Sequence, residues 1–307
     1  MDTLIQQIIN GLVLGSMYAL VALGYTMVYG IVNLINFAHG EILMVGALVS
    51  WSVVGALGGT GLPGWALMLV ALPCAIAACV ALNFAIERIA YRPLRNAPRM
   101  APLITAMGVS LLLQTLAMVL WKPSPKSFPQ LLPEARLEFL GAGITATQGL
   151  ILALSVAILA GLLALVQRSR LGRAMRATAE NPRAAVLMGV KPDFIISTAF
   201  LIGAGLAAVA GLMWAANYGT VQHTMGFMPG LKAFTAAVLG GIGNLGGAML
   251  GGLLLGLIEA IGAGYLGDLT GDVLGSNYAD IFAFVALIGV LTLRPSGLLG
   301  ERVADRA

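Results

Sequence analysis

Few residues in this sequence have the types and spacing that catalysis requires. Its four lysines all follow a residue other than glycine, so the Gly-Lys pair of a Walker A phosphate-binding loop is absent. His39 and His223 lie far apart in the chain, and no metal-ligand spacing appears. Cys74 and Cys79 share one apolar segment, where packing is their simplest role, and a serine nucleophile elbow is missing. The sequence therefore predicts a chain that is not an enzyme and holds no cofactor or metal.

Polar residues cluster around one glycine near the N-terminus. Asn33, Asn36, His39 and Glu41 surround Gly40 in an otherwise apolar stretch. Amide and imidazole groups can bond the backbone that a broken helix exposes, and the same groups could line a polar pathway. The sequence leaves these two roles open.

Four ionisable side chains lie within long apolar segments, namely Glu41, Glu87, Lys232 and Glu259. Such groups are costly in hydrocarbon and are functional candidates by default. The first three lie near the ends of their segments, where snorkelling or exposure at the membrane interface accounts for them. Glu259 is deeper, and it could face a cavity, pair with a base or be protonated because it is desolvated.

The composition identifies the elements that must position these residues. Hydrophobic residues make up 59% of the chain and charged residues 10%, whereas an average soluble domain has about 45–50% and about 25%. These values argue against a water-soluble enzyme and a disordered chain, and two cysteines argue against a disulfide scaffold. Forty glycines suit helices that pack closely in a membrane. We therefore predict an all-α polytopic membrane protein.

The hydrophobic pattern predicts where the helices lie. A helix needs about 20 apolar residues to cross the hydrocarbon layer. The candidate segments are residues 4–29, 41–57, 65–87, 101–121, 148–166, 194–216, 232–265 and 278–293. They predict a single transmembrane domain, residues 1–307, with about eight membrane helices (a range of seven to ten), some of them broken or re-entrant.

Basic residues predict the orientation. Of the 17 lysines and arginines, 13 fall into three blocks, at residues 88–99, 168–191 and 294–306. The positive-inside rule places these blocks in the cytoplasm, together with the C-terminus, so the net charge of +4 reflects loop orientation rather than nucleic-acid binding. The mixed loop 122–138 and the acidic loop 267–280 are then external. The side of the N-terminus stays open, because residues 30–40 are polar enough to break a helix.

Residues 232–265 pose a parity problem. An even number of crossings must separate Lys191 from Arg294, yet three apolar blocks lie between them. As one helix this stretch would be roughly 50 Å long, which exceeds a single untilted span. Its centre contains turn residues, among them Gly240, Gly241, Gly243 and Asn244. We predict a hairpin of two short or broken helices in the bundle interior; a tilted, kinked helix is the alternative.

The loop 167–193 is the largest cytoplasmic element. Asn181 suits a helix N-cap, Pro182 the first helical position and Gly189 the C-terminal stop, so we expect a short helix over residues 182–188. This helix carries apolar side chains, including Val186 and Leu187, which call for a partner surface. The alternative is a basic loop lying on anionic lipid headgroups.

Four motifs carry a resemblance to a known family. They are Ile-Asn-Phe-Ala-His-Gly-Glu at residues 35–41, Arg-Ala-Thr-Ala-Glu-Asn at 176–181, the long stretch 226–243, and Arg-Pro-Ser-Gly-Leu-Leu-Gly at 294–300. In this order they resemble the H-type permeases of branched-chain amino acid ABC importers over essentially the whole chain. The first and last motifs also occur loosely in permeases for urea or short amides, which stay an alternative.

The resemblance implies a type II ABC importer-like permease of the cell inner membrane. Its implied partners are a second, M-type permease, two cytoplasmic ATPases and a periplasmic amino-acid-binding protein, and ATP hydrolysis belongs to the ATPases. It implies that the cytoplasmic helix docks onto an ATPase, through a region that includes Arg176, Ala177, Glu180, Asn181, Ala184, Val186, Leu187 and Gly189. A proton-coupled secondary transporter is a weaker alternative, and it would need Glu259 as its titrating carboxylate.

Overall fold

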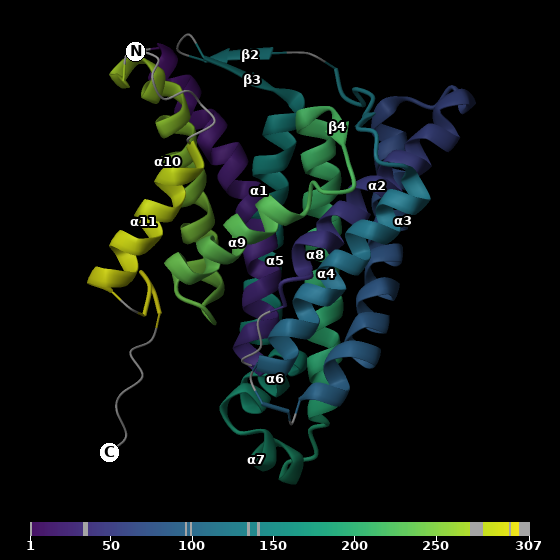
Figure 1. Ribbon diagram of the computed structural model, residues 1–307, viewed down its shortest axis with the longest axis vertical. Helices are drawn as coiled ribbons and strands as arrows, with labels where there is room; N and C mark the ends of the chain where they lie inside the picture. Colours follow the sequence, from purple (N-terminus) through teal and green to yellow (C-terminus); the bar gives the residue numbers. More distant parts are fainter. Residues whose placement is uncertain are drawn as a thin grey trace.

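Helices dominate the computed structural model (Figure 1), which describes residues 2–32, 36–95, 97–98, 100–133, 136–139, 142–270, 279–294 and 296–300. In these residues seven helical stretches are long and apolar enough to cross a membrane. The helices that form them are α1 (Asp2–Val32), α2 (His39–Leu57), α3 (Gly64–Ile86), α4 (Met100–Trp121), α5 (Ala146–Arg168), α8 (Pro192–Tyr218) and α10 (Leu245–Thr270). The predicted fold class is confirmed.

Shorter elements complete the described chain. The short helices are α6 (Arg170–Glu180), α7 (Pro182–Leu187), α9 (Phe227–Gly240) and α11 (Ala279–Leu293). Strand β1 (Lys126–Ser127) pairs antiparallel with β4 (Thr220–Val221), and β2 (Arg136–Phe139) pairs antiparallel with β3 (Ala142–Thr145). Beyond Ile86, α3 continues through a π-helical turn, Glu87–Tyr91, and a 3-10 turn, Arg92–Leu94.

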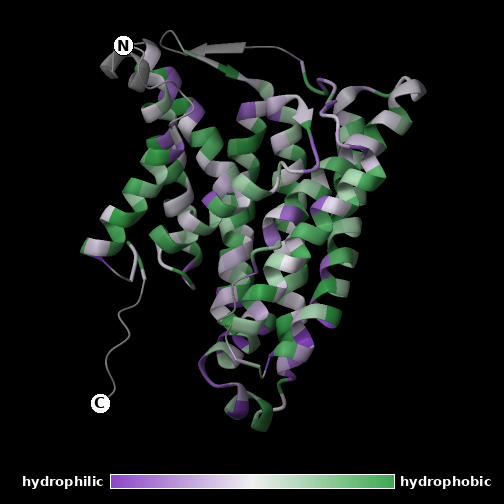
Figure 2. Cartoon of the chain, viewed as in Figure 1, coloured by the Kyte–Doolittle hydropathy of each residue, from purple (hydrophilic) through white to green (hydrophobic). Residues whose placement is uncertain are grey.

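The two ends of the bundle differ in character. Figure 1 shows β2, β3 and the start of α1 at one end, and α6 and α7 at the other. Gln6 joins α1 to the strand hairpin, because its Oε1 accepts a 2.9 Å hydrogen bond from the backbone N–H of Gly143. Hydrophilic residues gather on α6 and α7 in Figure 2, whereas the helices between the two ends are mainly hydrophobic. We call these the β2–β3 end and the α7 end.

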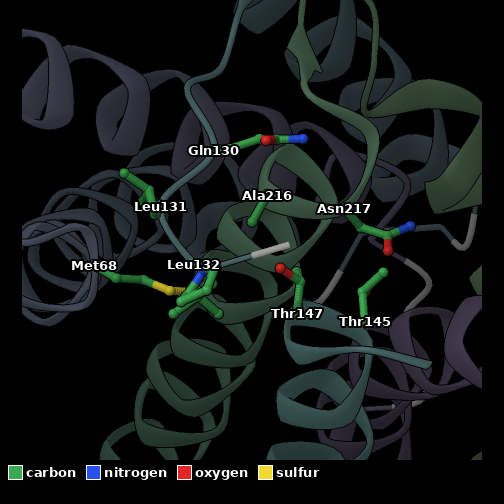
Figure 3. Close-up of a pocket in the computed structure, with 9 residues that line it drawn as sticks. Met68, Gln130, Leu131, Leu132, Thr145, Thr147, Ala216 and Asn217 are labelled. Atoms are coloured by element: carbon green, nitrogen blue, oxygen red, sulfur yellow. The ribbon is translucent and has the colours of Figure 1, made fainter. Parts of the chain in front are cut away.

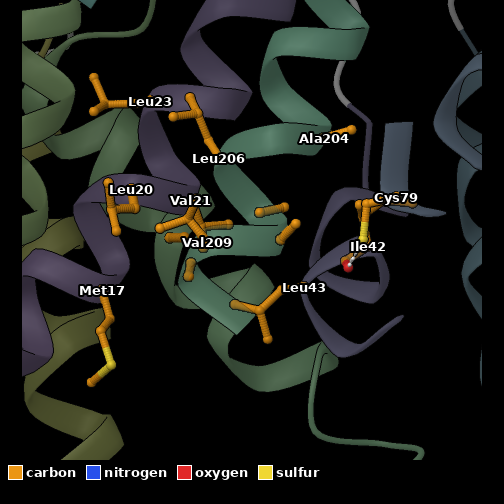
Figure 4. Packing of buried hydrophobic residues seen from close by; sticks show 14 of the residues in the cluster. Met17, Leu20, Val21, Leu23, Ile42, Leu43, Cys79, Ala204, Leu206 and Val209 are labelled. Carbon is orange, nitrogen blue, oxygen red and sulfur yellow. Dashed lines mark hydrogen bonds between the residues drawn. The ribbon is translucent and has the colours of Figure 1, made fainter. Parts of the chain in front are cut away.

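Helix α1 runs through the middle of the molecule and packs against α8, α9 and α10. Small residues make the α1–α10 contact close: a Cβ added to Gly15 would lie 2.7 Å from the Cα of Leu253. Figure 4 shows the apolar side chains of α1, α2 and α8 packed together. In the same view the Cys79 thiol donates to the carbonyl of Ile42 at 3.3 Å. Cys79 is thus a buried packing residue, as we predicted.

The hairpin predicted for residues 232–265 is confirmed, and the kinked-helix alternative is wrong. Helix α9 ends at Gly240 and α10 begins at Leu245. The turn between them requires glycine, since Gly241 and Gly243 have φ angles of 104° and 98°. With 14 residues, α9 rises only about 21 Å, which is short of a full crossing. The hairpin therefore contains one incomplete and one complete membrane helix.

The C-terminal motif packs against this glycine turn. The backbone N–H groups of Leu298 and Leu299 donate to the carbonyls of Leu239 and Gly240, both at 2.9 Å. The Asn244 side chain donates to the Leu299 carbonyl at 3.0 Å. The first two bonds satisfy carbonyls that the end of α9 would otherwise leave unpaired.

Candidate functional site

Two interrupted helices meet in the interior of the bundle. Helix α2 begins at His39, after the break that follows α1, and α9 begins at Phe227. A Cβ added to Gly40 would lie 2.5 Å from the carbonyl oxygen of Gly226 and 2.8 Å from the Cα of Gly230. The first and third sequence motifs therefore touch backbone to backbone, and a side chain larger than hydrogen at residue 40 would separate them.

The polar residues predicted around Gly40 are buried at this crossing. Asn36 accepts a 2.6 Å hydrogen bond from the hydroxyl of Tyr91. The ring of His39 lies with its centroid 4.8 Å from that of Tyr25, in an edge-on geometry. Asn33, which we grouped with them, lies outside the described residues.

Glu41 is held in the first turn of α2, where the helix dipole favours a carboxylate. It accepts hydrogen bonds from Ser110 at 3.0 Å and Gln114 at 2.7 Å, both on α4. Within the described part of the chain, its other carboxylate oxygen and the His39 Nε2 have no hydrogen-bond partner. The crossing thus keeps unsatisfied polar atoms in the membrane domain, which is costly and typical of functional positions.

Exposure at the membrane interface does not explain Glu41, Glu87 or Lys232, so that expectation is wrong. Glu41 and Glu87 are each 1% exposed and Lys232 is 7% exposed. Glu87 is ion-paired with Arg95 and accepts a 2.9 Å hydrogen bond from Ser197 on α8. Hydropathy placed these residues near the ends of their segments, but neighbouring helices cover them there.

Glu259 faces a cavity and pairs with a base, which were two of the three roles left open for it. Its carboxylate contacts the Lys232 ammonium at 2.6 Å and accepts a 3.0 Å hydrogen bond from the hydroxyl of Tyr18. Lys232 also lies 2.6 Å from Asp280 at the start of α11. The cavity has a volume of about 540 Å³ and lies between α1, α8, α9 and α10.

The short cytoplasmic helix forms where the sequence predicted it. Helix α7 spans Pro182–Leu187, and the Asn181 side chain accepts hydrogen bonds from the N–H groups of Arg183 and Ala184, both at 3.1 Å. Gly189 follows the helix with a φ of 82°, as a C-terminal stop requires. The expected caps are therefore both present, and Met188 serves as the C-cap.

Three consecutive apolar side chains project from α7. Val186 is 54% exposed, Leu187 87% and Met188 84%, while Ala185 packs inward. The other docking candidates, Arg176, Ala177, Glu180, Asn181, Ala184 and Gly189, are also on the surface. Such an apolar patch on the most hydrophilic end of the molecule is unusual unless it binds something.

A smaller cavity joins the α7 end to the glycine turn. It has a volume of about 140 Å³ and is lined by Gly30 on α1, Met175 and Arg176 on α6, and Gly243 in the turn. Helix α6 therefore lies beside the loop that joins α9 to α10. The sequence predicted both segments but did not predict that they line one cavity.

Figure 3 shows a separate hollow of about 170 Å³ at the β2–β3 end. Gln130 and Leu131 from the loop before β2, Thr145 and Thr147 at the start of α5, and Asn217 on α8 point toward it. These side chains are uncharged, and no sequence pattern singled them out.

Several residues of the interior site were missed. Asp280 was recognised only as part of an acidic external loop, and Tyr18 and Tyr91 were not selected. Their partners are distant in sequence: Tyr18 lies 241 positions from Glu259. No local pattern signals such a pairing. Among the described residues, no group of three His, Cys, Asp or Glu side chains could hold a metal ion.

Comparison with known proteins extends over nearly the whole chain. Residues 7–291 match the model of a family described as the permease component of branched-chain amino acid transport systems. The chain is 46% identical to the high-affinity branched-chain amino acid transport system permease protein BraD of Pseudomonas aeruginosa, over 98% of this chain and 97% of that protein. It is 43% identical to LivH of Escherichia coli strain K12, with the same coverage. A shorter likeness, 33% identity over half of this chain, connects it with the autoinducer 2 import system permease protein LsrC of Salmonella paratyphi B.

Proposed function

This chain belongs to the family of permease components of branched-chain amino acid transport systems, and we propose that it works as the H-type subunit of an ABC importer. It is a multi-pass membrane protein and a transport subunit rather than an enzyme. In the proposed assembly it pairs with a second, M-type permease. Two cytoplasmic ATPases supply the energy, and a periplasmic binding protein delivers the amino acid.

The exposed apolar patch on α7 is the observation that carries this proposal. Val186, Leu187 and Met188 lie at the end of the molecule that also holds most of the exposed arginines. When a partner covers three exposed apolar side chains on a folded, capped helix, the free energy falls, because their apolar surface is removed from water. We assign that partner as a cytoplasmic ATPase, because a chain without a Walker A loop needs its ATP hydrolysed elsewhere.

The remaining coupling residues support the helix or flank it. Asn181 caps α7, Gly189 ends it, and Arg176 on α6 donates a hydrogen bond to the carbonyl of Val166 on α5. Ala177, Glu180 and Ala184 contribute exposed surface on the same side. A movement of α7 would therefore be transmitted through α6 to the membrane helices.

The proposed route continues into the hairpin. The cavity shared by Met175 and Gly243 places α6 beside the glycine turn, so a shift of α6 would reach α9 and α10. The pathway or broken-helix residues in this proposal are Asn33, Asn36, His39, Glu41, Gly240, Gly241, Gly243, Asn244 and Glu259. Closure of the ATPases would move these interrupted helices and alternate access between the two sides.

The α7 end is proposed to face the cytoplasm, together with the C-terminus, in the cell inner membrane. The positive-inside rule supports this orientation, because two of the three basic blocks flank α4 and α5 at that end. The N-terminus is then external, since Gln6 near the start of α1 bonds to Gly143 in the β2–β3 hairpin, at the end opposite α7. Because the chain turns back at the α9–α10 hairpin, the number of crossings between Lys191 and Arg294 is even, although α9 itself is shorter than a full span.

Branched-chain amino acids are the proposed substrates, as the names of the relatives suggest. A proton-coupled carrier is not favoured, because the carboxylate of Glu259 is ion-paired with Lys232 at 2.6 Å. The long likeness to amino acid permeases does not favour the urea or short-amide alternative either.

Charge introduced into the α7 patch tests the proposal. In vesicles that contain all three kinds of partner, Leu187→Glu should lower ATP-driven leucine uptake by at least about tenfold, because an unpaired charge buried at an interface costs several kcal/mol. Gln167→Glu is the matched control, since it adds the same charge to an exposed residue of α5 at the same end. Co-purification of the ATPases reports docking directly. Normal uptake and normal ATPase binding by Leu187→Glu would contradict the assignment.

A further inference from the structure

The cavity beside Glu259 combines charged and apolar walls inside the membrane domain. Its volume of about 540 Å³ lies within the range of about 300–1,000 Å³ that is typical of small-molecule sites. The lining comes from α1, α8, α9 and α10 together with the segment that follows β4. Helices from both halves of the chain thus border one open cavity.

The charged wall is the ion pair of Lys232 and Glu259, and Asp280 contacts Lys232 from outside the cavity lining. Lys232 lies 2.6 Å from Glu259 and 2.6 Å from Asp280, so the group carries one more negative than positive charge. The side chains of Lys232 and Glu259 are 8% and 12% exposed, whereas that of Asp280 is 38% exposed. An ammonium group has three N–H donors, and two of them serve these carboxylates. Among the described residues these two carboxylates are the ion-pair partners of Lys232, which leaves its third donor for a further anion.

Most of the remaining lining is apolar or aromatic, and Thr220 and Gln222 add polar groups to it. Leu14, Met225 and Met228 line the cavity together with the ring of Trp214. That ring lies 5.9 Å from the ring of Tyr18, measured between centroids. Methionine and aromatic side chains adapt to aliphatic groups of different shape. This wall therefore suits a branched hydrocarbon side chain.

We propose that this cavity is a transit site for the transported amino acid, with Lys232 binding its carboxylate and Glu259 its ammonium group. This proposal rests on the proposed function. A zwitterion that enters the site brings one carboxylate and one ammonium group. The carboxylate meets Lys232 and the ammonium group meets Glu259, two residues that are ion-paired with each other before the ligand arrives. Binding then exchanges ion pairs without adding net charge to the membrane interior.

Weak binding is the expected consequence of this exchange. The ligand must compete with the internal contact between Lys232 and Glu259, so part of its interaction free energy is offset. Asp280 stays ion-paired with Lys232 while the ligand is bound, which limits the movement of the Lys232 ammonium group. A site of this kind releases its ligand readily, as passage through a transporter requires.

A structural role is the competing explanation. The three charges could merely fasten α9, α10 and α11 to one another. In that case the loss of import should follow the loss of thermal stability in each variant, and the more buried Glu259 should lose more of both than Asp280. The transit site predicts that Glu259→Gln loses more import than its thermal stability accounts for, because Glu259 lines the cavity and Asp280 does not.

Uptake by vesicles that contain the complete importer, compared with the thermal stability of each variant, distinguishes the two explanations. We expect Lys232→Met and Glu259→Gln each to lower the number of leucine molecules imported per ATP hydrolysed by about tenfold or more, the loss that follows removal of a charge-assisted hydrogen bond. Asp280→Asn, the matched control, should lower it by less than about threefold. Equal losses for Glu259→Gln and Asp280→Asn, a loss in Glu259→Gln that its thermal stability accounts for, or normal import by Lys232→Met, would overturn the proposal.

A labelling experiment measures occupancy of the cavity without depending on turnover. Met228→Cys, in a Cys74→Ala background, places a thiol on the cavity wall, and leucine-loaded binding protein should slow its reaction with a water-soluble thiol reagent. Adding Lys232→Met should abolish this protection. Protection that persists, or none in the parent protein, would overturn the transit site. Failure of the proposed function is distinct, since the unmodified importer would then show no ATP-driven leucine uptake.

Discussion

Replacing Gly40 with alanine tests the crossing of α2 and α9. The added Cβ would lie 2.5 Å from the Gly226 carbonyl oxygen and 2.8 Å from the Gly230 Cα. Ordinary contact begins near 3.4 Å, so the two backbones must separate by 0.6 to 0.9 Å. Overpacking of this kind costs about 1–3 kcal/mol. The variant should therefore unfold more readily than the parent and should transport less, because the interrupted helices no longer fit together.

Gly55→Ala on the same helix is the matched control. A Cβ added there meets no other described atom within 4 Å. The free energy of unfolding of this variant should therefore rise by about 0.5–1 kcal/mol, because alanine loses less backbone entropy on folding than glycine does. The two variants should thus differ by about 1.5–4 kcal/mol in stability. Thermal denaturation of the purified permease in detergent measures this difference, and leucine uptake measures the functional loss. Equal denaturation temperatures for Gly40→Ala and Gly55→Ala would refute the close approach of α2 and α9.

Three further predictions concern the caps, the buried ion pair and the glycine turn. Asn181→Ala removes the N-cap of α7 and should destabilise that helix by about 0.5–2 kcal/mol, seen as faster amide hydrogen exchange at α7; unchanged exchange would speak against the cap. Arg95→Ala leaves Glu87 buried without its cation and should lower the free energy of unfolding by about 3–5 kcal/mol. Its control, Arg92→Ala, breaks a mostly exposed ion pair and should lower it by at most about 1 kcal/mol. Similar denaturation temperatures for the two variants would contradict the burial of Glu87. Gly243→Ala should cost about 1–2 kcal/mol although its Cβ meets no described atom, because a φ of 98° disfavours alanine; a denaturation temperature equal to that of the parent would mean that the turn has another conformation.

Much of the architecture is predictable from local patterns. Apolar segments about 20 residues long mark the spans because the hydrocarbon layer has a definite thickness. The glycine run at residues 240–247 indicates the hairpin, since only glycine adopts such φ angles easily. Asn181, Pro182 and Gly189 mark both ends of α7 through caps that involve neighbouring residues. Each of these features depends on interactions within a few positions of the chain.

The interior site depends on contacts between distant segments. A membrane helix is apolar on all sides, so its periodicity does not indicate which side faces the protein. For this reason the burial of Glu41 and Glu87 was not predictable, although both residues were noticed. Lys232 and Glu259 are 27 positions apart, and only the packing of α9 against α10 brings their charges together.

The sequence by itself determined the class of the protein, its spans, the hairpin, the capped cytoplasmic helix and the family resemblance. The tertiary structure decided which polar groups meet. It joined Gly40 to Gly226 and Gly230, placed α6 beside the glycine turn, and gathered Lys232, Glu259 and Asp280 beside one cavity. The physical reason is that local patterns record the solvent and the backbone geometry of each segment, whereas the rotation and depth of each helix follow from how whole helices pack.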